Sequence, residues 1–167
     1  MTRRIEYRTT YEWPTARVFA ALTGPDCLRE RLRVLGGDNE LVEHEATETG
    51  ARFRIRQGVR AEVIPSVARA VVGGDLSIDR REIWRREADG SYAGEVTAGA
   101  LTVPQAITAS QRLRDLPPAG CEFVVEGDVK VGIPLLGGKL EDLFAGEVQS
   151  LLAAEHEFTV DWLSRHG

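Results

Sequence analysis

The sequence predicts a single α+β domain, residues 1–167, in which a curved antiparallel sheet of about seven strands surrounds a long C-terminal helix. Three features carry this prediction. Segments of alternating apolar and polar residues are separated by turn signals, two short helical segments follow the first strand, and an apolar stripe at helical spacing lies near the C-terminus. The 167 residues suffice for one sizeable core, and 43% hydrophobic and 28% charged residues are typical of globular chains.

The first expected strand covers residues 5–11, where Ile, Tyr and Thr side chains alternate with charged or polar ones. Pro14 follows it and favours the first turn of a helix whose apolar face includes Val18 and Leu22. After a break at residues 23–26, a second short helix is expected over residues 27–35.

A hairpin is expected next, with strands at residues 41–49 and 51–59. In its second strand Phe53, Ile55 and Gln57 share one face, and three arginines share the other. This alternation predicts a sheet with one face in water. Residues 64–72 fit either a short helix beginning at Pro65 or a strand.

Four further strands are expected, each bounded by glycine- or proline-containing turn signals. They cover residues 76–86, 92–98, 101–113 and 121–133. Apolar side chains at alternate positions of the last two place Ile107, Phe123 and Val125 on the inner face.

Gly137-Gly138 precedes a helix of about 28 residues, which would be roughly 40 Å long. Its apolar stripe comprises Leu140, Phe144, Val148, Leu151, Phe158 and Trp162. One helix, about 10 Å wide, cannot cover a flat sheet of this size. We therefore expect the sheet to curve around the helix and to leave an apolar cavity between them.

Charge and composition exclude several classes of function. The net charge of −5 gives no electrostatic basis for binding nucleic acid. The N-terminus lacks the apolar stretch of a signal peptide, and no run of about 18 apolar residues predicts a membrane span. A cytoplasmic location is expected, with Cys27 and Cys121 as buried or half-buried thiols in a reducing compartment.

Sequence motifs assign no catalytic residue, metal or cofactor. Residues 132–140 resemble a phosphate loop, but the lysine is one position late and leucine replaces the required hydroxyl residue. The segments that begin at His44 and His156 lack the second histidine of a zinc-protease helix. No nucleophile elbow is present in the sequence.

Glu155 is the most informative polar residue, because it falls within the apolar sector of the long helix. Two interpretations are open: a buried carboxyl group with a raised pKa, or a carboxylate that reaches water where the helix leaves the sheet. Trp84 is expected in the core, with a possible bulge beside it, and Arg80 and Glu82 either pair inside or lie on the wet face. His44 is expected at the core or the edge of the sheet.

The order of elements resembles the START-like or helix-grip superfamily. The resemblance rests on residues 7–22, where a strand and Trp-Pro lead into a helix with Val18-Phe19 and Leu22, and on Gly138 to Phe144 at the start of the last helix. The resemblance covers essentially the whole chain. More narrowly, the chain resembles a bacterial branch of that superfamily without an assigned function. The resemblance implies an internal hydrophobic pocket and implies no reaction.

The leading hypothesis is the binding or carriage of an apolar, lipid- or polyketide-like small molecule. Its expected binding residues are Phe53, Ile55, Gln57, Trp84, Gln105, Ile107, Phe123, Val125, Phe144, Val148, Leu151 and Glu155. One alternative is a cyclase- or dehydratase-type enzyme, which requires Glu155 and His44 to converge on one enclosed space. Another is a structural or interaction domain with a filled core. The glutamines, including Gln111, are either ligand anchors or residues at the rim.

Overall fold

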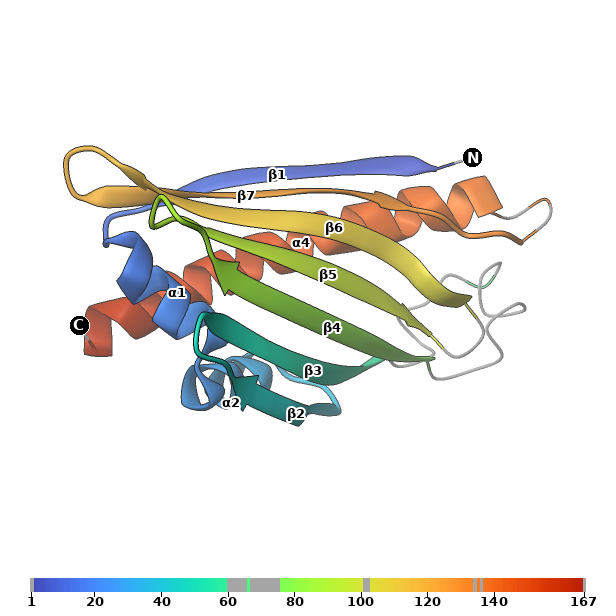
Figure 1. Ribbon diagram of the computed structural model, residues 1–167. Helices are drawn as coiled ribbons and strands as arrows, with labels where there is room; N and C mark the ends of the chain where they lie inside the picture. The colour runs from blue at the N-terminus through green and yellow to red at the C-terminus, as the bar shows by residue number, and fades with distance from the viewer. Residues whose placement is uncertain are drawn as a thin grey trace.

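The computed structural model describes residues 2–59, 66, 76–100, 103–133, 135 and 137–166, except for the side chains of residues 59, 76 and 103–105. Seven strands form one antiparallel sheet: β1 (Arg3–Tyr11), β2 (Asn39–Ala46), β3 (Gly50–Val59), β4 (Leu76–Arg86), β5 (Tyr92–Ala100), β6 (Val103–Leu116) and β7 (Gly120–Val129). The helices within the described ranges are α1 (Thr15–Thr23), α2 (Pro25–Leu35) and α4 (Gly137–His166). The sheet is curved and α4 crosses its inner side, as the sequence predicts (Figure 1).

The spatial order of the strands is β1-β7-β6-β5-β4-β3-β2. Strands β2 to β7 therefore follow one another as a meander, and β1 adds to the free edge of β7. Gly90, in the turn between β4 and β5, has a φ of +87°, which glycine adopts without strain. The expected strand at residues 76–86 matches β4, whereas the expected segment 64–72 lies outside the described residues apart from Ser66.

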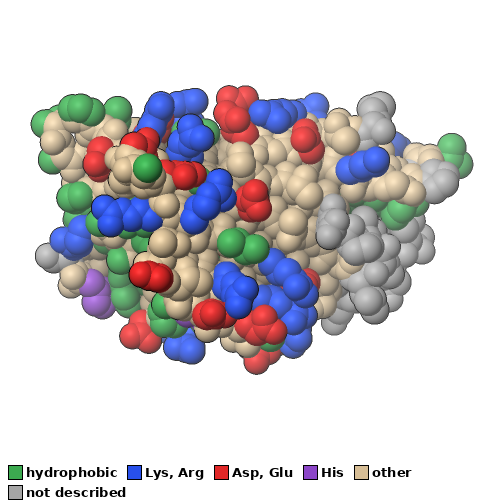
Figure 2. All heavy atoms as spheres, in the orientation of Figure 1, with side chains coloured by type: hydrophobic (Ala, Val, Ile, Leu, Met, Phe, Trp, Pro, Cys, Tyr) green, Lys and Arg blue, Asp and Glu red, His purple; other side chains and the backbone are tan. Residues whose placement is uncertain are grey.

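The outer face of the sheet is charged and solvated. Figure 2 shows basic and acidic side chains interspersed over this face. Cross-strand partners include Arg54 with Asp79, and Arg114 with Glu122. This confirms the predicted wet face, and the mixture of signs fits a solvated surface better than a binding stripe.

Two apolar clusters fill the inner side. The larger joins α1, α2 and the C-terminal half of α4 to the sheet, with Val18, Leu28, Ile55 and Leu113 fully buried. The smaller joins the start of α4 to β1 and β7. There the buried carboxylate of Glu141 accepts a hydrogen bond from the backbone amide of Val131 at 2.9 Å, which fixes the start of the helix.

The predicted stripe of α4 is only partly the buried face. Leu140 and Phe158 are buried, whereas Phe144, Val148, Leu151 and Trp162 are half-buried. The buried positions of α4 also include polar residues such as Glu155 and Thr159. Hydrophobicity alone therefore misplaces the centre of the buried face of α4, because some of its buried positions are polar residues that form hydrogen bonds and ion pairs.

Candidate functional site

Four charged side chains are buried together between the sheet and the helices. Arg31 comes from α2, Arg80 and Glu82 from β4, and Glu155 from α4; their exposed fractions are 3%, 8%, 3% and 6%. We call them the charge cluster. Side chains of this kind are rarely buried unless they are paired.

The alternation of β4 brings two members of the cluster to the inner face. Arg80, Glu82 and Trp84 point inward, and Ile83 between them is 54% exposed on the outer face. The register with β3 is continuous over this stretch, so the bulge considered beside Trp84 is absent from the described pairing. The interpretation that Arg80 and Glu82 pair inside is confirmed, and the wet-face alternative is wrong.

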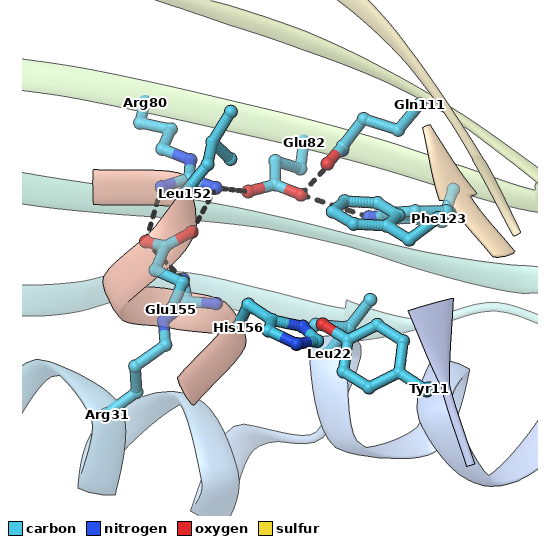
Figure 3. Close-up of a pocket in the computed structure, with 11 residues that line it drawn as sticks. Tyr11, Leu22, Arg31, Arg80, Glu82, Gln111, Phe123, Leu152, Glu155 and His156 are labelled. Carbon is cyan, nitrogen blue, oxygen red and sulfur yellow. Dashed lines mark hydrogen bonds and ion pairs between the residues drawn. The ribbon is translucent and has the colours of Figure 1, made fainter. Parts of the chain in front are cut away.

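Glu155 joins the two arginines (Figure 3). Its Oε2 and Oε1 accept hydrogen bonds from Arg80 Nη1 and Nη2 at 2.8 and 3.2 Å, a two-point contact. Arg31 Nη2 lies 3.5 Å from Glu155 Oε2. The carboxylate therefore links α2, α4 and β4, and the interpretation that it reaches water is wrong.

Glu82 extends the polar network across the sheet. Its Oε1 accepts hydrogen bonds from Trp84 Nε1 at 3.0 Å and from Gln111 Nε2 at 2.9 Å. Its Oε2 lies 2.7 Å from Arg80 Nη2. Gln111 is 4% exposed, so it is a buried partner of Glu82 and not a residue at the rim.

Two arginines keep the buried carboxylate of Glu155 ionised. Burial alone would raise the pKa of Glu155, but the positive charges of Arg31 and Arg80 and the hydrogen bonds from Arg80 lower it below its ordinary value. This corrects the prediction of a raised pKa, which considered burial without partners. Burial lowers the pKa of Arg80, and Glu155 and Glu82 more than reverse that effect.

Not every polar atom of the cluster is satisfied. Arg31 Nε and Nη2 and Glu82 Oε2 have no hydrogen-bond partner among the described residues. Arg80 Nη2 lies 2.7 Å from Glu82 Oε2, and Arg31 Nη2 lies 3.5 Å from Glu155 Oε2, but neither ion pair is aligned as a hydrogen bond. A buried donor or acceptor without a partner is unfavourable by about 1–3 kcal/mol.

These groups line a cavity of about 20 Å³. That volume accommodates about one water molecule or one ligand oxygen. The lining residues are Tyr11, Leu22, Arg31, Arg80, Glu82, Trp84, Gln111, Phe123, Leu152, Glu155 and His156. The sequence predicted an apolar cavity; the cavity here is small and has four charged side chains in its wall.

Tyr11 and His156 form the wall opposite Glu82 and Gln111 (Figure 3). Their ring centroids lie 4.7 Å apart, and His156 Nε2 lies 3.3 Å from Thr9 Oγ1. Burial lowers the pKa of His156 and raises the pKa of Tyr11. Both side chains are therefore uncharged at neutral pH.

The structure separates the expected binding residues into three groups. Trp84, Phe123 and Glu155 line the cavity; Phe53, Ile55 and Val125 are buried in the core; and Gln57, Ile107, Phe144, Val148 and Leu151 are half-buried. Gln105 belongs to β6, and its side chain lies outside the described residues.

His44 does not line the cavity that Glu155 lines. Its Nε2 lies 2.6 Å from the backbone oxygen of Thr23 at the end of α1, and its ring stacks on Phe53. The pair that the enzyme hypothesis required is therefore not brought together at this cavity.

Sequence reasoning missed Arg31, Tyr11 and His156 as parts of the site. The signal for Arg31 was present, because it follows Cys27 by four positions on the apolar face of α2. Tyr11 shares the inward parity of β1 with Ile5. His156 carried no such signal, since it lies beside the predicted stripe.

A family model described as "Protein of unknown function (DUF2505)" matches residues 6–163. The chain belongs to the DUF2505 family. An uncharacterized protein of Mycobacterium tuberculosis H37Rv is 27% identical to this DUF2505 chain over 111 residues, which are 66% of the chain and 64% of that relative. An uncharacterized protein of Mycobacterium bovis matches with the same values.

Solved structures place this DUF2505 protein in the START-like fold. The aromatase/cyclase Zhui from Streptomyces sp. R1128 has a TM-score of 0.63 at 13% identity, covering 99% of this chain and 95% of its own. A START superfamily protein from Mycobacterium smegmatis has a TM-score of 0.53 at 15% identity, covering 96% and 98%. At these identities the likeness shows the fold alone.

Two features are absent from the described residues. No helix there is long and apolar enough to cross a membrane. Within the same ranges, no three His, Cys, Asp or Glu side chains are grouped to hold a metal ion.

Proposed function

We propose that this DUF2505 protein binds a small, largely apolar molecule between the inner face of its sheet and α4. One observation carries the proposal: half-buried apolar side chains share the inner faces of α4 and the sheet with a buried polar cluster that retains unpartnered atoms. Leu151 and Val148 precede Glu155 by four and seven positions, the spacing of one helical face. Ile107 lies in the same cross-strand row as Arg80, through Ala98.

The cavity at the charge cluster accommodates only one end of such a ligand. Its volume of about 20 Å³ is far below the roughly 300 Å³ at the lower range of ligand sites. The body of the ligand would lie against the apolar side chains of Ile107, Phe144 and Val148, and its polar end at Glu155. Partly buried apolar surface on an inner face favours this arrangement, because contact with a ligand removes that surface from water.

The fold supports the same proposal. Among the structurally similar proteins are an aromatase/cyclase and a START superfamily protein. A sheet that curves around one helix recurs in these proteins, so this chain has a scaffold that suits an interior ligand. Carriage of a lipid- or polyketide-like molecule is the specific form of binding that we propose.

Native mass spectrometry of the purified protein tests the proposal, followed by titration with dodecan-1-ol, dodecan-2-one and 2-naphthol. Trp84 lies in the cavity wall, so saturable changes in tryptophan fluorescence report occupancy. We expect saturable binding of at least one compound, weakened by Phe144→Ser and unchanged by Glu147→Ser, an exposed position on the same helix. A bare mass together with no saturable change for any compound would contradict the proposal.

A further inference from the structure

The charge cluster limits which polar group a ligand can present. It contains two guanidinium groups, from Arg31 and Arg80, and two carboxylates, from Glu82 and Glu155. The titratable groups that face it from β1 and α4, Tyr11 and His156, are uncharged at neutral pH. The described wall of the cavity is therefore electrically balanced without a ligand.

A ligand carboxylate fits this wall poorly. It would bring a fifth charge into a buried space where the other four already compensate one another. It would also compete with Glu155 for Arg31 and Arg80, whose guanidinium groups already lie 3.5 and 2.8 Å from Glu155 Oε2. An uncharged polar group avoids both effects.

The unpartnered atoms specify the hydrogen bonds that such a group must make. Arg31 is 3% exposed, lines the cavity and has two donors, Nε and Nη2, without hydrogen-bond partners among the described residues. Glu82 Oε2 lies 2.7 Å from Arg80 Nη2 as an ion pair, accepts no aligned hydrogen bond among the described residues, and so can accept one from a ligand. A hydroxyl group both accepts and donates hydrogen bonds, whereas a ketone or an ether only accepts.

We infer that the charge cluster is the recognition site for an uncharged hydroxyl group at the end of an apolar ligand, and that it discriminates against carboxylates. The aromatic rings of Trp84 and Phe123 in the same wall provide the apolar surroundings for the adjoining carbon atoms. This inference rests on the proposed function, since it names the class of ligand for the same interior site.

A series of ligands with one chain length tests the inference: dodecan-1-ol, dodecyl methyl ether and dodecanoate, titrated at neutral pH and followed by tryptophan fluorescence. We expect dodecan-1-ol to bind about tenfold more tightly than the ether, the effect of one buried hydrogen bond, and more tightly still than dodecanoate. Dodecanoate binding equal to or tighter than dodecan-1-ol binding would overturn the inference and leave the proposed function intact. If none of the three compounds shows saturable binding, the result counts against the proposed function itself.

Substitution of Arg31 tests whether this side chain donates hydrogen bonds to the polar group of the ligand. Arg31→Met removes the unpartnered donors and leaves Glu155 paired with Arg80. Both dodecan-1-ol and the ether can accept hydrogen bonds from Arg31, so we expect the variant to bind each of them about tenfold more weakly than wild type and to keep the preference for the alcohol, which alone can donate to Glu82 Oε2. Arg33→Met is the control, because Arg33 lies on the same helix with 71% of its side chain exposed. An Arg31→Met protein that is folded by circular dichroism and binds both compounds as tightly as wild type would overturn the assignment. If that variant does not fold, the ligand series on the wild-type protein still decides.

Discussion

Arg80 and Glu155, 75 positions apart in the chain, form a buried two-point ion pair that joins the middle of the sheet to α4. Arg80→Met would leave two buried carboxylates, Glu82 and Glu155, with only one buried arginine. We expect the free energy of unfolding to fall by about 3–5 kcal/mol, the usual effect of breaking a buried pair on one side. Arg81→Met, on the exposed face of the same strand, should change it by about 0–1 kcal/mol. Urea unfolding measures both, and equal effects would contradict the buried role of Arg80.

The stability that Glu155 contributes should depend on pH. Its folded-state pKa lies below the ordinary value of 4.5, so its contribution is complete above that pH and is lost as pH falls through the folded-state pKa. Glu155→Gln should therefore be less stable than wild type at neutral pH, and the difference should narrow in acid. Urea unfolding over a pH series tests this, with the exposed Asp161→Asn as control. A difference that stays constant into acid would show that the carboxylate is not held ionised by its partners.

Gly94 and Gly146 should respond in opposite ways to the same substitution. A Cβ atom at Gly94 would lie 2.8 Å from Cδ2 of Trp84, whose ring is held by contacts with Phe19 and Phe123. Gly94→Ala should therefore lower stability by about 1–3 kcal/mol. Gly146, inside α4, has open space at this position, so alanine should raise stability by about 0.5–1 kcal/mol. Thermal unfolding distinguishes the two, and a stabilising Gly94→Ala would contradict the close contact with Trp84.

Neither cysteine should react in the folded protein. Cys27 is 5% exposed and Cys121 is fully buried, and burial raises the pKa of each thiol to about 12. Thiolates are the reactive form, so Ellman's reagent near pH 8 should detect almost no thiol in the native state and two after unfolding in urea. Rapid reaction of one thiol in the native protein would show that its segment opens readily.

Local patterns predicted the fold well because they report which face of each element is buried. Alternation in residues 76–86 defined β4, and Pro14 marked the start of α1. The structure confirms the curved sheet around one long helix, and the wet outer face that the arginines of β3 implied.

The site was harder to predict, because the periodicity of a sequence indicates which face of a helix or strand is buried and does not indicate which side chains of other elements it contacts. The pattern placed Glu155 on an apolar face, but the direction of its pKa shift depends on Arg31 and Arg80, which come from other elements. Similarly, the parity of β4 allowed Arg80 and Glu82 to point either way. Only the tertiary packing of α2 and α4 against the sheet decides between those alternatives.

The pairing of β1 with β7 also affects how the chain can fold during synthesis. Arg8 of β1 binds Glu122 of β7, 114 positions later, and the partners of β1 in the sheet lie in β7. While the ribosome makes the intervening meander, β1 has no strand beside it, and closure of so long a loop is slow. The charged side chains Arg3, Arg4, Glu6 and Arg8 of β1 should therefore keep the waiting strand from pairing with other nascent chains.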